Sequence, residues 1–561
     1  MTQLIECVPN FSEGRDLGVI EQITDAIESV DGVTLLDVDP GHATNRTVVT
    51  FVGAPDEVVE AAVRAGAMAA ELIDMSQHSG EHPRFGGMDV CPLVPIADIT
   101  MDDTVGHARH LAERLAAEAG LTVYCYEHAA TTENRRDLAA VRGGEYEGLP
   151  DKLADPAWKP DFGPVAFNPR TGATAVGARD FLVAYNVNLN TTSTRRANAI
   201  AFDVRQKGRM KREGHPLTGT IVRDEGGEPV WTPGALPSVK AIGWFIEEYG
   251  VAQISMNLTN ISVTPVHVAF DETVARAEAR GVRVTGSELV GLIPLQAMLD
   301  AGRHYLRKQK RSLGVPDAEL VKIAVKSLGL DDLGAFIPSD KIIEYRLADP
   351  TVRRLIDLPV AGFVEETASE SAAPGGGSVS ALLGALGAAL ATMVANLSSH
   401  KRGWDERWEE FSDAAVEAKG FHSHLTRLID EDTDAFNRVM AAFRLPTTTD
   451  AESQARAATI EEATRGATEV PLRVMAAALE SMSVIGRMAE TGLPSSVSDA
   501  GVAAICARAA VMGAHLNVRA NVATLDDAVY AEESLAAARS IEDKALAAEE
   551  AILEIVRRKL E

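Results

Sequence analysis

The feature that most constrains this chain is a change of sequence pattern near Leu347. Before it, short runs rich in β-branched and aromatic residues alternate with stretches of helical period. Strand-like runs include LIECVPNF, RTVVTFVG and LTVYCYEH, and the pattern restarts at FLVAYNVNL and AQISMNLT. Because a sheet must bury one face against helices, the alternation predicts two α/β sandwich subdomains.

After this point the strand pattern disappears. Long helical runs follow, separated by PGGGS, RLPTTTD and NVATLDD, which predicts an all-α helical bundle. We therefore expect a multidomain chain with an N-terminal α/β part and a helical-bundle domain. The expected boundaries are 1–180 and 181–346 for the two α/β subdomains, 347–359 for a linker, and 360–561 for the bundle. Segment 214–237, rich in Gly and Pro, is predicted to be an exposed insertion.

The balance of charge restricts the partners. The 54 basic and 81 acidic residues give a net charge of −27, which repels nucleic acid and anionic membrane surfaces. We expect neither as a partner. The apolar run Val379–Leu397 is rich in Ala and Gly, which favours a buried bundle helix over a membrane-spanning one. The four cysteines form no CxxC pair and are typical of free thiols in a reducing cytoplasm.

The stretch HSGEHPRFGG, residues 78–87, contains an H-x-x-E-H pattern that is shared by some zinc proteases. A zinc pair would need His78 and His82 on one turn of helix. Gly80 is typical of a position just past a helix end, and Pro83 favours an extended conformation at His82, so we expect no metal. Two alternatives for His82 remain. It either only hydrogen-bonds within its loop or acts as a general base oriented by Glu81.

The stretch LTRLIDEDTDAFNRVM is predicted to be an amphipathic helix. Its apolar stripe consists of Leu425, Leu428, Ile429, Phe436 and Val439. Asp432 falls on this stripe, whereas Asp430 and Asp434 point away from it. A carboxylate among apolar side chains is costly unless it is paired or used, and burial should raise its pKa, which suits proton transfer. A structural carboxylate that caps a neighbouring helix fits the spacing equally well.

Two glycine-containing loops are less specific. Gly375, Gly376 and Gly377 precede a predicted helix, where free backbone N–H groups could hold an anion or a carbonyl. A tight turn between helices is the alternative reading. The second loop, GPVAFNPRTG, taken alone indicates only a turn-rich surface loop.

Long blocks of the chain resemble the formimidoyltransferase-cyclodeaminase family. The resemblance begins at ECVPNFSEG and is strongest in IDMSQHSGEHPRFGGMDVCPLVP. It continues through PDFGPVAFNPRTGATAVGARDFL, SAAPGGGSVSALLGALGAALATMV, LIDEDTDAFNRVM and MGAHLNVRANV. It implies that His82 is the catalytic residue of the transferase and Asp432 that of the cyclodeaminase. The implied folate-binding loop consists of Gly163, Pro164, Val165, Ala166, Phe167, Asn168, Pro169, Arg170, Thr171 and Gly172.

The resemblance also implies the chemistry. A formimino group would move from N-formimidoyl-L-glutamate to N5 of the co-substrate tetrahydrofolate. The helical part would then close the product to 5,10-methenyltetrahydrofolate and release ammonia. Substrate carboxylates need cations, and Arg46 and Arg84 could serve or could form structural salt bridges instead. We expect a cytoplasmic homo-oligomer that needs no metal.

Some features differ from the animal members of this family. The 214–237 insertion is longer here, and Arg170 and Thr171 differ within the implied folate loop. Three alternatives to the implied activity are a transferase that uses a formyl donor at the same His82, an H-x-x-E-H zinc hydrolase, and a non-catalytic folate carrier.

Overall fold

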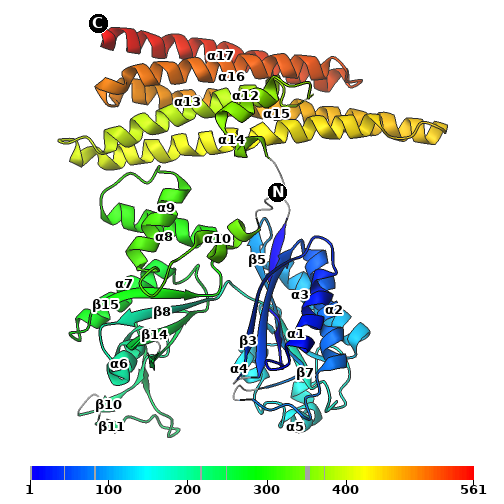
Figure 1. Cartoon of the computed structure of the whole chain (residues 1–561), viewed down its shortest axis with the longest axis vertical. Helices are drawn as coiled ribbons and strands as arrows, with labels where there is room; N and C mark the ends of the chain where they lie inside the picture. The colour runs from blue at the N-terminus through cyan, green and yellow to red at the C-terminus, as the bar shows by residue number, and fades with distance from the viewer. Residues whose placement is uncertain are drawn as a thin grey trace. The chain divides into compact units, whose positions relative to one another are not determined.

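The structure, a computed structural model, describes residues 3–42, 45–80, 84–214, 218–247, 249–347, 354–371 and 373–561. It divides into two compact units, Met1–Ala301 with Val325–Ala348, and Gly302–Ala324 with Asp349–Glu561. The first unit is mixed α/β and the second is helical (Figure 1). The predicted fold class is therefore confirmed.

The first subdomain is built on a seven-stranded sheet of order β1-β4-β2-β5-β7-β6, with β3 paired to β4. β1 and β2 both lie between β4 and β5 and run antiparallel to them, whereas β5, β7 and β6 are parallel. The strands are β1 Leu4–Cys7, β2 Asn10–Phe11, β3 Thr34–Gly41, β4 Arg46–Gly53, β5 Met88–Ala97, β6 Thr122–Glu127 and β7 Ala173–Ala178.

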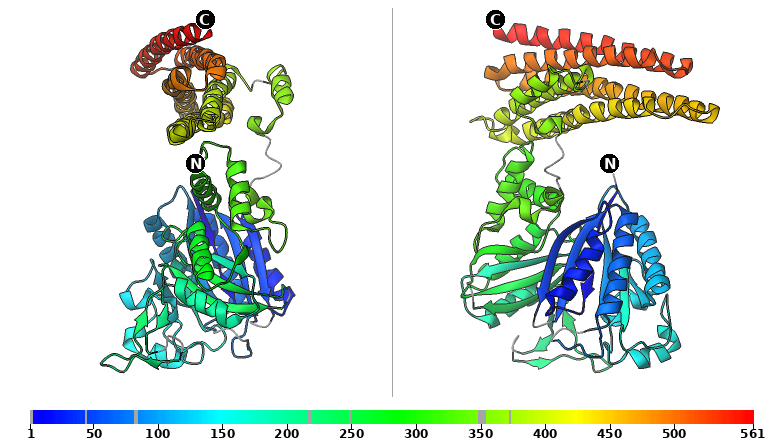
Figure 2. Two further views of the ribbon diagram at one scale, coloured as in Figure 1. Left: turned by 90° about the vertical axis from the view of Figure 1, so that its left-hand side faces the viewer. Right: turned by 45° about the vertical axis from the view of Figure 1, so that its right-hand side comes forward.

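Three helices cover one face of this sheet (Figure 2): α1 Leu17–Glu28, α2 Pro55–Leu72 and α3 Met101–Ala119. Local sequence sets the limits of α3, because Thr100 and Asp103 form a capping box and Gly120 ends the helix in a left-handed conformation. The short helices α4 (Leu138–Val141) and α5 (Leu149–Ala154) pack with Tyr124 in a smaller apolar cluster.

The second subdomain contains an antiparallel sheet of order β13-β14-β8-β15. Alternate residues of β8 face opposite sides, so Tyr185 and Val187 are buried with apolar neighbours while Asn188 hydrogen-bonds Gln253 at 2.8 Å. The elements are β8 Val183–Leu189, α6 Thr194–Val204, β13 Val239–Ile246, β14 Val251–Leu258, α7 Val266–Glu278, β15 Val284–Val290, α10 Pro338–Lys341 and α11 Ile343–Arg346. Two further helices, α8 Leu295–Lys308 and α9 Asp317–Leu328, follow β15 in sequence and lie partly in the other compact unit.

The predicted insertion falls within a region of two short antiparallel ribbons. One pairs β9 (Arg209–Met210) with β12 (Trp231–Thr232), and the other pairs β10 (Arg212–Glu213) with β11 (Thr220–Ile221). The described side chains between Arg209 and Thr232 are half-buried or exposed, with no fully buried one among them, in agreement with the expected exposure.

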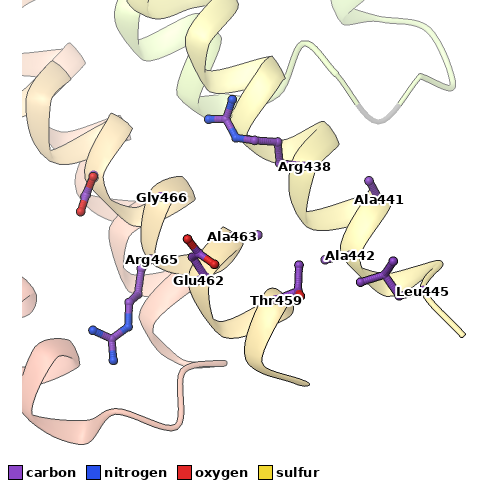
Figure 3. A pocket seen from close by; sticks show the side chains of 10 residues that line it. Arg438, Ala441, Ala442, Leu445, Thr459, Glu462, Ala463, Arg465 and Gly466 are labelled. Carbon is purple, nitrogen blue, oxygen red and sulfur yellow. The ribbon is translucent and has the colours of Figure 1, made fainter. Parts of the chain in front are cut away.

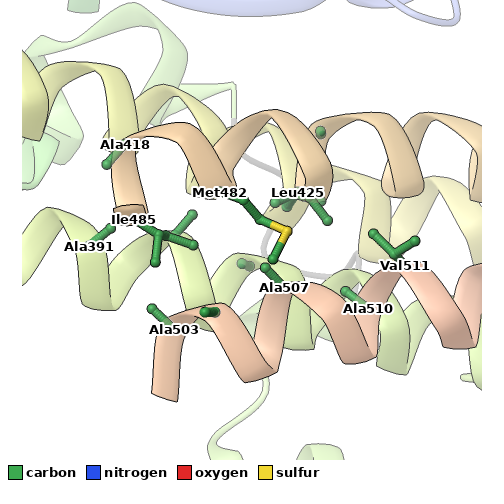
Figure 4. Close-up of a cluster of buried hydrophobic side chains, with 14 of the residues drawn as sticks. Ala391, Ala418, Leu425, Met482, Ile485, Ala503, Ala507, Ala510 and Val511 are labelled. Atoms are coloured by element: carbon green, nitrogen blue, oxygen red, sulfur yellow. The ribbon is translucent and has the colours of Figure 1, made fainter. Parts of the chain in front are cut away.

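The helical unit contains five long helices that run side by side (Figure 2). They are α13 Gly376–Ser399, α14 Trp408–Phe443, α15 Asp450–Thr491, α16 Val497–Val522 and α17 Ala528–Leu560, preceded by the short α12 Val360–Thr367. Their core is rich in alanine, and Figure 4 shows Ala391, Ala503 and Ala507 beside Met482 and Ile485. Small side chains let the helix backbones approach closely, since a Cβ on Gly387 would lie 2.8 Å from the Ala503 carbonyl oxygen.

The connection between α8 and α9 packs within this helical unit. Ser312 donates to Asn396 at 2.6 Å, and the Leu313 amide donates to Ser412 at 3.0 Å. A Cβ on Gly314 would lie 2.5 Å from the backbone of Ala415, so only glycine allows this approach. Segment 302–324 therefore belongs structurally to the helical unit, although it precedes the end of the α/β part in sequence.

Two bundle helices are long and apolar enough to cross a membrane by length and composition alone. They are Gly376–Ser399, which includes the run singled out in the sequence, and Pro494–Val522. In the apolar windows of these helices, 61% and 50% of the residues are buried inside the protein. Core helices of bundles meet the same criterion, and this burial is what a bundle position predicts.

Candidate active sites

In the α/β unit, sequence blocks that lie far apart meet at the end of the sheet where β5 and β7 begin. The Ser12 hydroxyl donates to the Gly86 carbonyl at 2.8 Å, and Gly86 and Gly172 form a β-bridge. A Cβ on Gly86 would lie 2.2 Å from the Ala173 carbonyl oxygen, which explains the glycine. The structure thus brings the segment after the histidine motif against the end of the predicted folate loop.

The described part of the histidine motif is held by Asn45. Its side chain accepts from the Gly14 amide and donates to the Ser79 carbonyl, both at 3.0 Å. The His78 Nε2 atom lies 2.8 Å from the Asn45 carbonyl oxygen, which makes Nε2 the donor and leaves Nδ1 buried without a hydrogen-bond partner. Burial lowers the pKa of His78 and Arg84 adds to the effect, while the hydrogen bond to Asn45 acts in the opposite direction, so the environment favours the neutral imidazole. His82 itself, with Glu81 and Pro83, lies outside the described residues.

Arg84 joins the histidine motif to the folate loop through an aromatic pair. Its guanidinium lies 4.9 Å from the centre of the Tyr146 ring and contacts Glu147. Tyr146 packs on Phe167 at 5.6 Å and donates to the Pro169 carbonyl at 2.6 Å. Tyr146 was not singled out by the sequence, because nothing in EYEGLP indicates that it would stack on residues more than twenty positions away.

Arg46 is anchored by a buried carboxylate. Asp89, which is fully buried, contacts Arg46 and also lies 2.6 Å from Arg142. The Arg46 Nε atom donates to the Asn10 side chain at 3.1 Å. Burial lowers the pKa of Arg46 to about 9, with Arg142 adding to the effect. Of the two arginines proposed as substrate ligands, both are held by protein partners, since Arg84 also donates to the Met75 carbonyl at 3.3 Å, and Arg84 is the more accessible of the two.

The folate loop is fixed at both ends. Gly163 and Gly172 have positive φ angles of 85° and 65°, which favour glycine. A Cβ on Gly163 would lie 2.0 Å from the Leu121 carbonyl oxygen. Between these ends, Pro164 to Ala166 are exposed, whereas Thr171 is buried. The loop therefore presents an exposed middle on rigid ends, which suits ligand contact.

In the helical unit, Asp432 of α14 lies against the first turn of α13. Ser378 donates to its Oδ2 atom at 3.0 Å, and a Cβ on Gly377 would lie 2.1 Å from its Oδ1 atom. Burial raises the pKa of Asp432, while hydrogen bonds from Ser378 act in the opposite, smaller direction. The structure is consistent with both interpretations of Asp432. Its carboxylate faces the start of α13, as a capping residue would, and it is largely buried with a raised pKa, as a proton-transfer residue would be.

Asp432 also lines a cavity of about 620 Å³. The three glycines predicted to bind substrate, Gly375, Gly376 and Gly377, line it as well. Its other walls are Ala373, Thr433, Phe436, Val439, Met440, Phe443, Ile460, Thr464, Ala467, Asn517, Ala520, Asn521 and Thr524. Among these described lining residues Asp432 is the one ionisable group, which makes it the candidate proton acceptor of a cavity lined otherwise by apolar, threonine and asparagine residues and by glycines.

The predicted apolar stripe of α14 changes role along the helix. Leu425, Leu428 and Ile429 are buried in the bundle core, as expected. Phe436 and Val439 face the cavity instead, and Phe436 is 36% exposed. The difference arises because α13 begins beside Asp432, so that α13 does not cover the part of the stripe beyond it, and α15 and α16 face that part across the cavity.

A second hollow of about 670 Å³ lies between α14 and α15 (Figure 3). Its lining combines Ala441, Ala442 and Leu445 with charged Arg438, Glu462, Arg465 and Glu469. Arg465 is already bound to Asp527 at 2.6 Å. This hollow contains neither a buried carboxylate nor a helix start among its described residues, so the Asp432 cavity is the stronger candidate site of the bundle.

Each of the two units contains one candidate site. In the α/β part the candidate site adjoins the motif of His82, which itself lies outside the described residues, and in the bundle it contains Asp432. No group of three or more His, Cys, Asp or Glu residues that could hold a metal occurs in the described part of the chain. The chain thus has the organisation of a protein with two separate candidate sites, one in each unit.

Comparisons with known proteins agree with this organisation. Residues 4–179 match the N-terminal subdomain of the formiminotransferase domain, 184–348 the formiminotransferase domain, and 359–540 formiminotransferase-cyclodeaminase. The chain is 42% identical to the formimidoyltransferase-cyclodeaminase of Mus musculus over 535 residues, 95% of each chain. The chain therefore belongs to the formiminotransferase-cyclodeaminase family.

Each half also has separate relatives. The glutamate formimidoyltransferase of Thermoplasma acidophilum is 44% identical over 308 residues, which are 54% of this chain and 92% of that protein. The methenyltetrahydrofolate cyclohydrolase of Methylorubrum extorquens is 39% identical over 198 residues, which are 35% of this chain and 95% of that protein.

Proposed function

We propose that this chain is a bifunctional folate enzyme that carries out formimino transfer and cyclodeamination in succession. The observation that carries the proposal is the presence in one chain of both family parts, each with a site suited to its step. N-Formimidoyl-L-glutamate is the donor, tetrahydrofolate the acceptor, and 5,10-methenyltetrahydrofolate and ammonia are the products of the second step.

In the transferase step, N5 of tetrahydrofolate attacks the formimino carbon and loses its proton as the new bond forms. A neutral imidazole beside N5 accepts that proton, and glutamate leaves from the tetrahedral intermediate. His82 is proposed for this role. The neighbouring Asn45, His78 and Arg84 contacts support the proposal, because they fix the backbone on both sides of the motif.

In the cyclodeaminase step, N10 of the folate adds to the amidinium carbon of the 5-formimidoyl group. The proton of N10 passes to Asp432, which then delivers it to the amino nitrogen of the intermediate. The carbon–nitrogen bond breaks, ammonia leaves, and the positive charge of the amidinium remains on the methenyl product. One carboxylate with a raised pKa suffices for both transfers.

A coupled assay tests the whole proposal. Protein supplied with formiminoglutamate and tetrahydrofolate should form methenyltetrahydrofolate, followed by absorbance, and ammonia in equal amounts. Both rates should persist with a metal chelator present. Loss of activity with chelator would support the zinc hydrolase alternative, and folate binding without turnover would support the carrier. Preference for formylglutamate over formiminoglutamate would favour the formyl-transferase alternative.

We further propose that the chain forms a homo-oligomer through one face of α13 and α16. The exposed apolar residues of this face are Leu386, Met393, Leu397, Val502, Ile505, Met512 and Leu516. α13 carries no charged residue, although the chain has a net charge of −27. α16 contributes Arg508, which contacts Met512 and is neutralised by Glu549 at 3.0 Å. Two copies can therefore meet at this face without opposing unpaired charges of α13, which argues for a second copy as the occupant.

Sedimentation of Leu516→Lys tests this interface. Leu516 is 64% exposed, so the change should leave the fold intact while it places a charge in the contact. We expect the wild-type assembly to dissociate into smaller species in the variant. The control is Leu560→Lys, a 64% exposed residue at the end of α17. A monomeric wild type, or binding of the wild type to lipid vesicles through this face, would contradict the proposal.

A cytoplasmic location is also proposed. It is supported by the four cysteines, all of which are free thiols. Cell fractionation with recovery of the protein in a membrane or secreted fraction would refute it.

A further inference from the structure

The hydroxyl of Ser378 touches more acceptors than it has protons to give. Its Oγ atom lies 3.0 Å from Asp432 Oδ2, 3.0 Å from the Ile429 carbonyl oxygen and 3.3 Å from Thr433 Oγ1. Ser378 is fully buried, so water does not compete for these contacts. A hydroxyl carries one proton and two acceptor lone pairs. Ser378 can therefore donate to Asp432 or to Ile429, but not to both at once.

The two possible arrangements match the two charge states of the carboxylate. When Asp432 is ionised, Ser378 donates to Oδ2. When Asp432 carries a proton, that proton can be donated to Ser378 Oγ, and the hydroxyl of Ser378 turns to the Ile429 carbonyl. In the first arrangement Thr433 can donate a hydrogen bond to Ser378 Oγ. In the second arrangement Thr433 accepts no additional hydrogen bond. Each state thus leaves no buried donor of this group unsatisfied.

We propose that Ser378 is a positioning residue of the cyclodeaminase, whose hydroxyl switches between Asp432 and the Ile429 carbonyl as Asp432 gains and loses its proton. The inference rests on the proposed function, in which Asp432 is protonated and deprotonated once in each turnover. A fixed donor would stabilise only the charged form. A hydroxyl with an alternative acceptor lets the carboxyl group gain or lose its proton while every buried polar group of the cluster keeps a hydrogen-bond partner.

The surroundings leave this role to Ser378. The other charged groups near Asp432 in sequence, Asp430, Glu431 and Asp434, lie on its own helix. The Asp430 side chain accepts from the Leu355 amide at 2.8 Å, and Glu431 binds Arg473 at 2.7 Å. α13 has no charged residue, and no charged residue of α15 or α16 is among the described residues that line the cavity. The nearest polar contacts of the carboxylate are therefore those of Ser378 and the start of α13.

The test is the pH dependence of kcat/KM for cyclisation of supplied 5-formimidoyltetrahydrofolate by Ser378→Ala. The hydrogen bond from the Ser378 hydroxyl favours the charged carboxylate, so its loss raises the pKa of Asp432, while the hydrogen bond from the Ser378 backbone, which acts in the same direction, remains in the variant. Because the ionised form accepts the N10 proton, the acid limb of the profile should move to higher pH by about one unit. Below the limb the rate should fall about tenfold, and on the plateau it should stay within about twofold.

The matched control is Ser380→Ala. Ser380 is on the same helix, is 3% exposed, and donates to the Gly376 carbonyl at 2.6 Å rather than to Asp432. Its acid limb should stay at the wild-type position. A uniform loss of rate at every pH in Ser378→Ala, or an unmoved limb, would overturn the proposed role, because a packing defect acts on all protonation states equally.

A second variant covers the possibility that Ser378→Ala fails to fold. Ser378→Cys retains a weak donor of similar size, so its limb should shift in the same direction by a smaller amount. An unmoved limb in the folded Cys variant would refute the switch. Failure of the underlying function is distinguishable, because the wild-type protein would then not cyclise the substrate at any pH.

Discussion

Asp432→Asn is expected to lose at least ~100-fold of its cyclodeaminase activity, the scale of general acid–base catalysis. The amide keeps the size of the side chain and its place beside Gly377 and Ser378 but accepts no proton. Transferase activity should be retained, because it resides in the other unit. 5-Formimidoyltetrahydrofolate should therefore accumulate in the coupled assay while ammonia release stops, and separate measurement of the two products checks this.

Asp434→Asn is the matched control, since Asp434 is exposed on the same helix two residues away and is absent from the cavity lining. It should cyclise at close to the wild-type rate. Asp430 serves less well, because its carboxylate holds the Leu355 amide. A folded Asp432→Asn protein that releases ammonia at the normal rate would refute the assignment. The search would then turn to Asn521, which lines the cavity, and to Asp499.

His82→Ala should show the opposite pattern, with formimino transfer reduced at least ~100-fold and cyclisation of supplied 5-formimidoyltetrahydrofolate unchanged. The expectation follows from the position of His82 between two anchored segments, the His78–Ser79 contacts with Asn45 and the Gly86–Gly172 bridge. Initial rates of the two half-reactions, measured separately on one preparation, test it.

His110→Ala, an exposed histidine on α3, is the control for general effects of losing an imidazole. It should retain both activities. Transfer at the wild-type rate in His82→Ala would exclude His82 from the mechanism. His78 would then be the next candidate, because its Nδ1 atom is a buried acceptor without a partner in the described structure.

Several features of this protein follow from local sequence alone. The period of apolar residues distinguishes the α/β part from the bundle, because a strand repeats every two residues and a helix every 3.6. The position of Asp432 on the apolar side of its helix follows from the same period. Burial then raises the pKa of its carboxyl group, in the direction that the pattern predicts. Gly80 and Pro83 predict from backbone preferences that no helical metal pair forms, and this stays a prediction because residues 81–83 lie outside the described residues.

Other features depend on contacts between residues that are distant in sequence, which no local period encodes. Arg46 could have been a substrate ligand or a salt-bridge partner, and its contact with Asp89 appears only when β4 and β5 lie in one sheet. The Gly86–Gly172 bridge joins two loops because β5 and β7 pair in parallel.

The cavity of the bundle was likewise decided by tertiary structure. Phe436 continues the apolar stripe that Leu428 and Ile429 begin, yet it faces the cavity because α14 extends past the start of α13. Ser378 meets Asp432 only because those two helices pack at this level. Sequence period determines which side of a helix is apolar, whereas the lengths and offsets of the packed helices determine whether that side becomes core or active site.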